Sequence, residues 1–202
     1  MKSTHFPDPI ADEMIRAILD NRKTVTRRVV KPQQLRVLDS PYHKEHPKTP
    51  DKVLLERLCE PPYLPGDILY VREMWQHGFG GTYLYRASAG HDLFMTADGE
   101  LVSDIPWRPS IHMPREAARI FLRVTDVQVE RLQDVTEEDA IKEGCTAHGG
   151  NLALDEFEVV WHNTLKPTDR SIYGWAANPW VWVIEFERIS REEAEDGLQR
   201  AG

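Results

Sequence analysis

Cysteine and long apolar runs are both scarce in this chain. Cys59 and Cys145 are the only cysteines among 202 residues, and they lie far apart in no metal-ligand spacing. Such a pair predicts reduced thiols in a cytosolic protein rather than a disulfide framework. No run of eighteen apolar residues is present, so the sequence predicts no membrane-spanning helix and no membrane partner. The first residues lack the apolar stretch of a signal peptide, and we therefore expect a cytoplasmic protein.

Positive charge is also in short supply. The 25 Lys and Arg residues are outnumbered by 33 Asp and Glu residues, which gives a formal net charge of −8. A long DNA duplex is bound through many contacts from Lys and Arg to phosphates, so we expect no long duplex DNA as a partner. The balance still allows a local basic pocket for one nucleotide. Six Trp and six Tyr offer faces for base stacking, although most aromatic residues belong to protein cores.

No metal-ligand pattern is evident in the sequence. His43 and His46 are close together, but they lie in a stretch rich in Pro and Lys without a recognisable set of ligands. We therefore predict no metal and no organic cofactor.

The first predicted elements are a helix and a strand. Asp8 and Pro9 suit the N-cap and first turn of a helix over residues 9–20, and Asn21 favours the left-handed conformation that ends helices. The β-branched segment 23–30 predicts a strand.

The remaining pattern predicts an α+β chain. Strands cluster in the middle and at the end with helices inserted between them, which favours this class over a doubly wound parallel sheet. Segment 31–65 is expected to be irregular, with a short helix near 53–58, and 190–202 to be a frayed charged tail. Further strands are predicted over 68–75, 82–87, 119–131 and 180–189, and helices over 136–143 and 154–165.

The last predicted strand implies a definite register. Trp182 and Ile184 share one face of it, whereas Glu185 and Glu187 alternate with them. We expect the first two side chains to be buried and the two glutamates to face solvent, because a slip by one residue would exchange the faces.

The densest polar cluster follows the first helix, and it consists of Lys23, Thr24, Thr26, Arg27 and Arg28. One interpretation is a solvated edge strand, in which Lys and Thr are common. The other is a reactive site. Lys23 would lie at the helix-to-strand turn, where its ammonium can reach the Thr26 hydroxyl. A desolvated Lys can lose its proton and activate such a nucleophile. Neither side chain is expected in the apolar core.

Two other clusters carry candidate residues. Glu137 to Asp139 complement the dipole of the helix that they begin, but Glu143 lies at its other end, where the dipole disfavours an acid. The loop that holds Trp107, Arg108 and His112 is bracketed by prolines. It is either a rigid recognition loop or an ordinary loop with a packed Trp.

Three stretches together resemble the ASCH family. Residues 18–28, Ile-Leu-Asp-Asn-Arg-Lys-Thr-Val-Thr-Arg-Arg, look like its N-terminal signature. Pro-Gly-Asp-Ile-Leu at 65–69 resembles its second landmark, and 177–186 its closing strand. The chain looks like the longer ASCH proteins of bacteria and their phages.

The resemblance implies a fold and a domain organisation. ASCH domains are similar to the PUA fold, a small β-barrel associated with RNA, here with peripheral helices and long loop insertions. We accordingly expect one PUA-like domain over 1–189. The insertions are expected at about 32–64, 77–113 and 145–174, followed by the tail 190–202.

The resemblance also implies a site. Small bacterial ASCH enzymes hydrolyse N(4)-acetylcytidine with a Lys, a Thr and a Glu, which match Lys23, Thr26 and Glu143 here. The implied activity is amide hydrolysis of a modified nucleoside or a similar N-acyl substrate. Arg28 would lie at the edge of the cleft and, with the loop residues Trp107, Arg108 and His112, would bind the substrate.

Other functions remain open at this point. The same cleft would serve a non-catalytic module that binds a nucleotide or short single-stranded RNA. A ribonuclease would use Lys, Arg and His112, and a phage-associated interaction protein would need the cluster only as surface. The sequence leaves the oligomeric state open.

Overall fold

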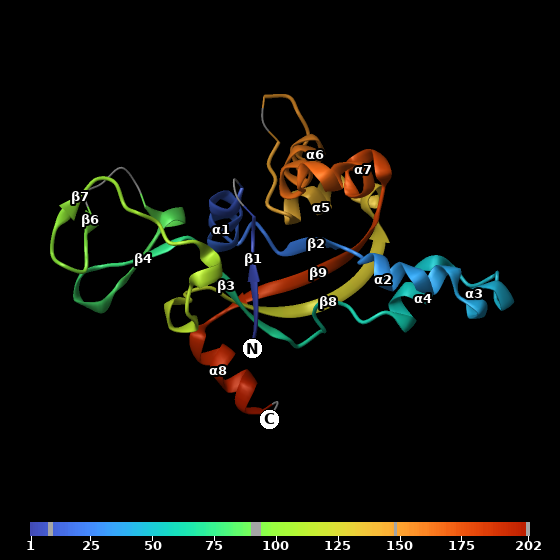
Figure 1. The fold of residues 1–202 in the computed structure, drawn as a ribbon, viewed down its shortest axis with the longest axis horizontal. Coiled ribbons are helices and arrows are strands. Elements are labelled where there is room, and N and C mark those ends of the chain that lie inside the picture. The colour runs from blue at the N-terminus through green and yellow to red at the C-terminus, as the bar shows by residue number, and fades with distance from the viewer. Residues whose placement is uncertain (8–9, 90–93, 148, 201–202) are drawn as a thin grey trace. The chain divides into compact units, whose positions relative to one another are not determined.

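The computed structural model describes residues 1–7, 10–89, 94–147 and 149–200. The chain is α+β, as predicted, and its main sheet has the strand order β1-β3-β8-β9-β2 (Figure 1). The closed barrel that the family resemblance implies stays a prediction. The strands are β1 (Lys2–His5), β2 (Val25–Val29), β3 (Ile68–Arg72), β4 (Trp75–His77), β5 (Tyr83–Tyr85), β6 (Phe94–Met95), β7 (Leu101–Val102), β8 (Phe121–Arg131) and β9 (Trp180–Ile189). The α-helices are α1 (Ala11–Leu19), α2 (Pro32–Leu35), α3 (Pro41–Glu45), α4 (Asp51–Leu58), α5 (Glu137–Lys142), α6 (Ala153–Thr164), α7 (Arg170–Tyr173) and α8 (Arg191–Arg200).

The chain divides into two compact units, each built from separate segments. Unit 1 comprises Met1–Arg22, Ile68–Leu122 and Arg188–Gly202, and unit 2 comprises Lys23–Asp67 and Arg123–Glu187. Strands β8 and β9 contribute residues to both units. The single domain expected over 1–189 stays a prediction.

In unit 2, β2 pairs with β9 in an antiparallel register that places Arg28 opposite Trp182 and Thr26 opposite Ile184. Trp182 and Ile184 are buried and Glu187 is exposed, as predicted, but Glu185 is only partly exposed. Val181 and Val183 on the other face are buried as well, so both faces of this part of β9 are covered.

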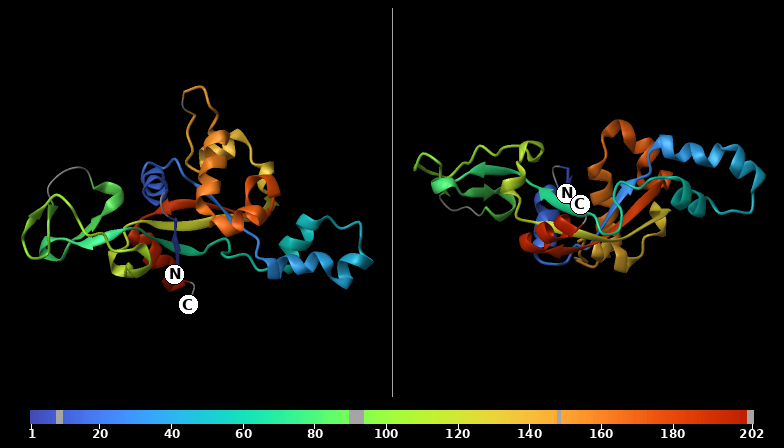
Figure 2. Two further views of the ribbon diagram at one scale, coloured as in Figure 1. Left: turned by 45° about the horizontal axis from the view of Figure 1, so that its top comes forward. Right: turned by 90° about the horizontal axis from the view of Figure 1, so that it is seen from below.

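Helices α5 and α6 cover the face of the β2–β9 pair that lies opposite to Trp182 and Ile184, and both Figure 1 and Figure 2 show them on one side of these strands. The apolar side chains of both strands and both helices form one buried cluster on this side. Burial of such side chains is the main favourable term in folding. Its buried members are Val25, Leu132, Val135, Ala140, Cys145, Ala153, Phe157, Trp161, Val181 and Val183.

Helix α5 begins and ends as its sequence predicts. The Thr136 hydroxyl accepts a hydrogen bond from the Asp139 backbone N–H at 3.2 Å, and the Asp139 carboxylate accepts one from the Thr136 N–H at 3.1 Å. This reciprocal capping satisfies donors that a helix start leaves unpaired. Gly144, at φ 95°, adopts the left-handed conformation that ends the helix.

The insertion at 32–64 contains more helix than predicted. Besides the expected α4, it forms α2 and α3, which begin at Pro32 and Pro41. Proline at the first helical position has its φ angle preset and sacrifices no hydrogen bond. The prolines of this segment predicted irregular structure, but two of them begin helices.

In unit 1, helix α1 ends at the predicted residue. Asn21 has φ 58°, and the Arg22 N–H donates to the Ala17 carbonyl at 2.8 Å. The predicted cap at Asp8 and Pro9 lies outside the described residues. Strand β1 pairs in parallel with β3 and was not predicted, because its short polar segment shows no alternation of its own.

Unit 1 also contains a hairpin, in which β4 pairs with β5 in antiparallel register. Strand β5 falls within the strand predicted over 82–87, whereas the strand predicted over 68–75 is divided between β3 and β4. A second hairpin of β6 and β7 lies in a stretch interpreted as loop. Pairs of two residues carry almost no periodic signal, so the sequence could not indicate it.

The prediction of a frayed tail over 190–202 is wrong, because residues 191–200 form helix α8. Ala194 is fully buried in a cluster with Ile68 and Phe121, and the Arg191 guanidinium donates to the Ala118 carbonyl. Charged residues predominate because only one narrow face of the helix is covered.

Gly197→Ala is expected to stabilise the chain. A Cβ at this position would lie 3.5 Å from Cγ1 of Ile68, an ordinary van der Waals contact. Glycine inside a helix costs about 0.5–1 kcal/mol relative to alanine. We therefore expect urea denaturation to show a free energy of unfolding higher by about that amount. A decrease would show that α8 does not pack against Ile68 in this way.

No helix in the described part of the chain is both long enough and apolar enough to cross a bilayer.

Candidate functional site

The site lies in unit 2 and is centred on the residues that lead into β2. Strand β2 begins at Val25, so the strand is shorter than the one predicted over 23–30, and Lys23 and Thr24 precede it at the turn. The Thr24 N–H donates to the Lys142 carbonyl, and the Thr24 carbonyl accepts from the Phe186 N–H, both at 2.8 Å. These bonds fix the junction between the end of α5 and strand β9.

The Lys23 ammonium contacts three acceptors. It donates to the Val25 and Glu143 carbonyl oxygens at 2.8 Å each, and to Oε2 of the Glu143 carboxylate at 2.5 Å. Three acceptors match the three N–H groups of an ammonium. The side chain is only 2% exposed and that of Glu143 7%, so this ion pair is buried.

Glu143 joins Lys23 to a second cation, Arg27, which belongs to the predicted polar cluster but had no predicted role in the site. Its Oε1 lies 3.2 Å from Nη1 of Arg27. The Arg27 guanidinium also pairs with Glu130 at 2.7 Å and lies 3.8 Å from Asp139. The result is a network of two cations and three carboxylates, in which Glu143 is shared.

Burial and charge act on these groups in opposite directions. Burial lowers the pKa of Lys23 below its ordinary value, and the Glu143 carboxylate opposes this only in part. Burial also favours a lower pKa for Arg27, but Glu143 and Glu130 outweigh it and raise the pKa. Burial raises the pKa of Glu130 despite the opposing charge of Arg27.

This burial excludes one interpretation of the polar cluster, the solvated edge strand, and leaves the reactive site as a prediction. Strand β2 is the last in the sheet order, yet Lys23, Thr26 and Arg27 are only 3%, 7% and 4% exposed. A solvated edge strand would leave Lys and Arg in water. Lys23 and Arg27 instead belong to a buried polar network in which both cations are paired, as charged groups at such depth must be.

The Thr26 side chain lies on the face of β2 opposite to that of Arg27. Alternation turns its side chain to the face of Arg28, and the register places both opposite residues of β9 on that face. The structure brings Lys23 and Glu143 into direct contact. Thr26 lies within β2, three residues after Lys23 in the sequence. Arg28 follows Thr26 on this face and is half-buried.

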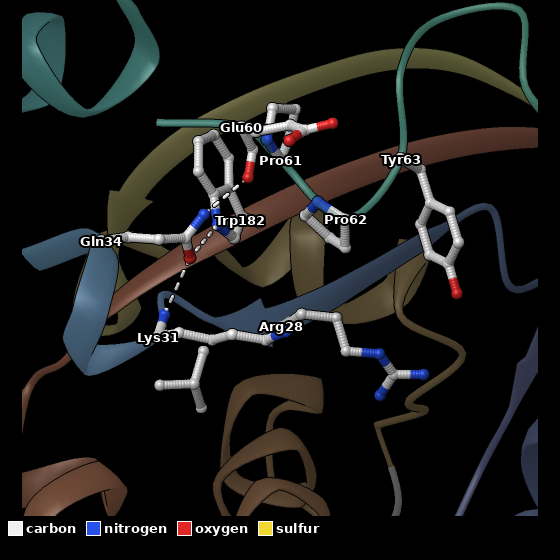
Figure 3. Close-up of a pocket in the computed structure, with 9 residues that line it drawn as sticks. Arg28, Lys31, Gln34, Glu60, Pro61, Pro62, Tyr63 and Trp182 are labelled. Carbon is white, nitrogen blue, oxygen red and sulfur yellow. Dashed lines mark hydrogen bonds between the residues drawn. The ribbon is translucent and has the colours of Figure 1, made fainter. Parts of the chain in front are cut away.

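A cavity of about 400 Å³ opens on the same face, beside Arg28 (Figure 3). One side is formed by β2, its continuation into α2, and Trp182 of β9; the other is formed by the end of the 32–64 insertion. A volume of this size is typical of sites for small molecules. The lining residues are Arg28, Val29, Lys31, Gln34, Glu60, Pro61, Pro62, Tyr63 and Trp182.

Arg28 and Tyr63 face each other across the cavity. The Arg28 side chain extends along β2 toward the hydroxyl end of Tyr63, as Figure 3 shows. Burial lowers the pKa of Arg28, and Tyr63 and Glu143 oppose the shift. Sequence reasoning identified Arg28 but missed Tyr63, since nothing in an insertion between prolines indicates which strand it will meet.

The remaining predicted residues lie in unit 1. Arg108 forms a β-bridge with Trp75, and its guanidinium lies 5.4 Å from the centre of the Trp75 ring. His112 is exposed, and Trp107 is half-buried. The substrate-binding role predicted for Trp107, Arg108 and His112 stays a prediction.

The donor groups do not resemble a metal centre. Among the described residues, no three or more His, Cys, Asp or Glu side chains are placed to hold a metal ion. The carboxylates of the Arg27 network instead accept from nitrogen donors.

Comparison with known proteins identifies similar folds. A scan of protein-family models finds no match, and a search of curated proteins finds none either. Among solved structures, the chain is similar to an ASCH domain from Lactobacillus crispatus, with a TM-score of 0.46 and 11% identity over 94% of this chain and 80% of that one. It is also similar to a DUF984 protein from Enterococcus faecalis, with a TM-score of 0.44 and 14% identity over the same shares.

Proposed function

We propose that the chain is an amide hydrolase that acts on an N-acylated nucleoside such as N(4)-acetylcytidine. The observation that carries this proposal is the buried pair of Lys23 and Glu143, with the buried Thr26 three residues after Lys23 in the sequence. A Lys desolvated in this way is the kind of base that activates a hydroxyl nucleophile. The motif resemblance adds the same three residues in the same roles.

In the proposed reaction, the Thr26 hydroxyl attacks the acyl carbon and gives its proton to neutral Lys23. Lys23 then protonates the departing amine nitrogen, which leaves the acyl group as an ester on Thr26. Water attacks this ester with Lys23 again accepting the proton, and a carboxylic acid leaves as the Thr26 hydroxyl is restored. Glu143 holds Lys23 in place throughout the reaction and does not itself move.

The developing oxyanion requires a donor. Arg28 shares the strand face of Thr26, since the two residues alternate with Arg27. We propose that its guanidinium, or a backbone N–H at the junction, stabilises the oxyanion. The neighbouring cavity, at about 400 Å³, would receive the nucleoside.

A binding module is the second candidate, and the hydrogen bonds of Lys23 favour it. Its ammonium donates to the Val25 carbonyl and to two oxygens of Glu143. Catalysis needs at least one of these bonds to be exchanged for the Thr26 hydroxyl. If it is not, the network is structural, and the cavity with Arg28 and Tyr63 binds a nucleotide or short single-stranded RNA without cleaving it.

The deciding experiment follows acetate release from acetylcytidine incubated with the purified chain. Release that scales with protein concentration supports the hydrolase. Absence of release, combined with saturable binding of cytidine or a short RNA, supports the module. Other N-acyl nucleosides tested in parallel separate a wrong substrate from an absent activity.

The pH profile of kcat/KM should rise with pH. Only neutral Lys23 can accept the Thr26 proton, and burial lowers the pKa of Lys23 from its ordinary 10.5. We therefore expect the rate to increase as Lys23 loses its proton and to level off below pH 10.5, after hydrolysis without protein is subtracted. A flat profile, or a rise confined to pH above 10.5, would exclude Lys23 as the base.

A further inference from the structure

The two ends of the 32–64 insertion meet at the side chain of Gln34. Its carbonyl Oε1 accepts from the Lys31 N–H at 3.0 Å and from Nε1 of Trp182 at 3.4 Å. Its Nε2 donates to the Glu60 carbonyl at 2.6 Å. The Gln34 backbone carbonyl also accepts from the Cys59 thiol at 3.4 Å. One residue thus connects β9, the start of α2 and the end of the insertion (Figure 3).

The chain segment that Gln34 holds forms a wall of the cavity. Residues 60–63 line it opposite Arg28, and Pro61 and Pro62 give this segment a restricted backbone. Glu60 and Pro62 are exposed, so apolar burial does little to fix them. A segment with so little buried surface depends on hydrogen bonds for its position.

We propose that Gln34 is a positioning residue whose carboxamide holds the Glu60–Tyr63 wall against Trp182, and thereby sets the width of the cavity that receives the base of the substrate. This rests on the proposed function, in that the cavity is taken as the substrate pocket. The insertion then belongs to the site, because it supplies the face on which the ligand packs. Tyr63 is the wall residue placed to contact the base, and base stacking on tyrosine is a common mode of recognition.

Gln34→Glu separates the two functions of this side chain. A carboxylate retains the oxygen that accepts from Lys31 and Trp182, but it loses the N–H that reaches the Glu60 carbonyl and places an oxygen there instead. Gln34→Met removes all of these bonds and keeps the length of the side chain. Gln33→Glu is the matched control, because it introduces the same charge on an exposed neighbour in α2.

Steady-state kinetics with acetylcytidine gives the first measurement. We expect KM to rise roughly 3–10-fold in Gln34→Glu and in Gln34→Met with kcat retained, because the wall contributes binding and not chemistry. Gln33→Glu should match the wild type. Equal KM values for all four proteins, or a fall in kcat alone, would overturn the positioning role.

Hydrogen exchange at the Tyr63 and Leu64 amides gives a measurement independent of turnover. Both Gln34 variants should exchange faster there than wild type and Gln33→Glu, with unchanged protection in β9. Unchanged exchange at these amides overturns the proposal. If exchange is faster but the wild type neither binds nor cleaves any nucleoside, Gln34 holds the wall as inferred, and it is the proposed function that has failed.

Discussion

Thr26→Val is expected to abolish hydrolysis of acetylcytidine while the chain stays folded. Valine has nearly the shape of threonine and suits a strand, but it has no hydroxyl to attack the acyl carbon. Loss of a catalytic nucleophile lowers kcat on the order of 10³-fold or more. Thr26 has no hydrogen bond to Lys23 among those described for the ammonium, so its removal leaves the Lys23–Glu143 pair intact. The measurement is acetate release under saturating substrate, with circular dichroism to verify folding.

Thr24→Val is the control for this prediction. It makes the same chemical change two residues earlier, at a half-buried position before β2 begins, and should retain most of the activity. If Thr26→Val keeps its turnover but Lys23→Met loses it, water is the nucleophile, and Thr26 has no covalent role.

Glu143→Gln is expected to cause the largest loss of stability. Its carboxylate is shared by Lys23 at 2.5 Å and by Arg27 at 3.2 Å, and all three side chains are almost fully buried. Removal of one partner from a buried ion pair typically costs about 3–5 kcal/mol, because the other charge remains uncompensated. Urea denaturation at neutral pH should show a loss of this size.

Lys23→Met should cost less than Glu143→Gln. The Glu143 carboxylate then still has Arg27 as its partner, and methionine fills the volume of the lysine chain. Glu138→Gln is the matched control on the exposed side of α5, and it should change the free energy of unfolding by less than about 1 kcal/mol. If Lys23→Met is as unstable as Glu143→Gln, the hydrogen bonds from Lys23 to the backbone carbonyls contribute more to stability than its ion pair with Glu143 does.

The Glu143→Gln variant should regain part of its stability as pH rises. Without the carboxylate, the pKa of Lys23 in the folded state falls further below its unfolded value, because burial already lowers it. The unfolded chain then binds more protons between the two pKa values, so the free energy of unfolding increases with pH in that window. A stability that is independent of pH up to 10.5 would contradict this interpretation.

The candidate site was predictable only in part. The motif resemblance selected Lys23 and Glu143 for the site, and the structure places their ammonium and carboxylate in contact, while their catalytic role stays a prediction. Alternation along a strand turns Arg27 and Thr26 to opposite faces. It could not indicate that the face of Arg27 would meet Glu130 and Glu143 from distant parts of the chain, because the spacing of residues within a strand carries no information about its neighbours.

The fold shows the same division. The sequence by itself determined the α+β class, the capped helix α5, the left-handed Asn21 that follows α1 and the burial of Trp182 and Ile184, because capping chemistry and hydrophobic patterning act within a few residues. Helix α8, strand β1 and the cavity depend on contacts between segments far apart in the sequence, so only the tertiary structure decided them. Helix α8 forms where Ala194 finds a buried surface, and β1 forms where β3 offers an edge. The cavity arises where Gln34 ties residues 60–63 to Trp182, since its walls come from segments that only folding brings together.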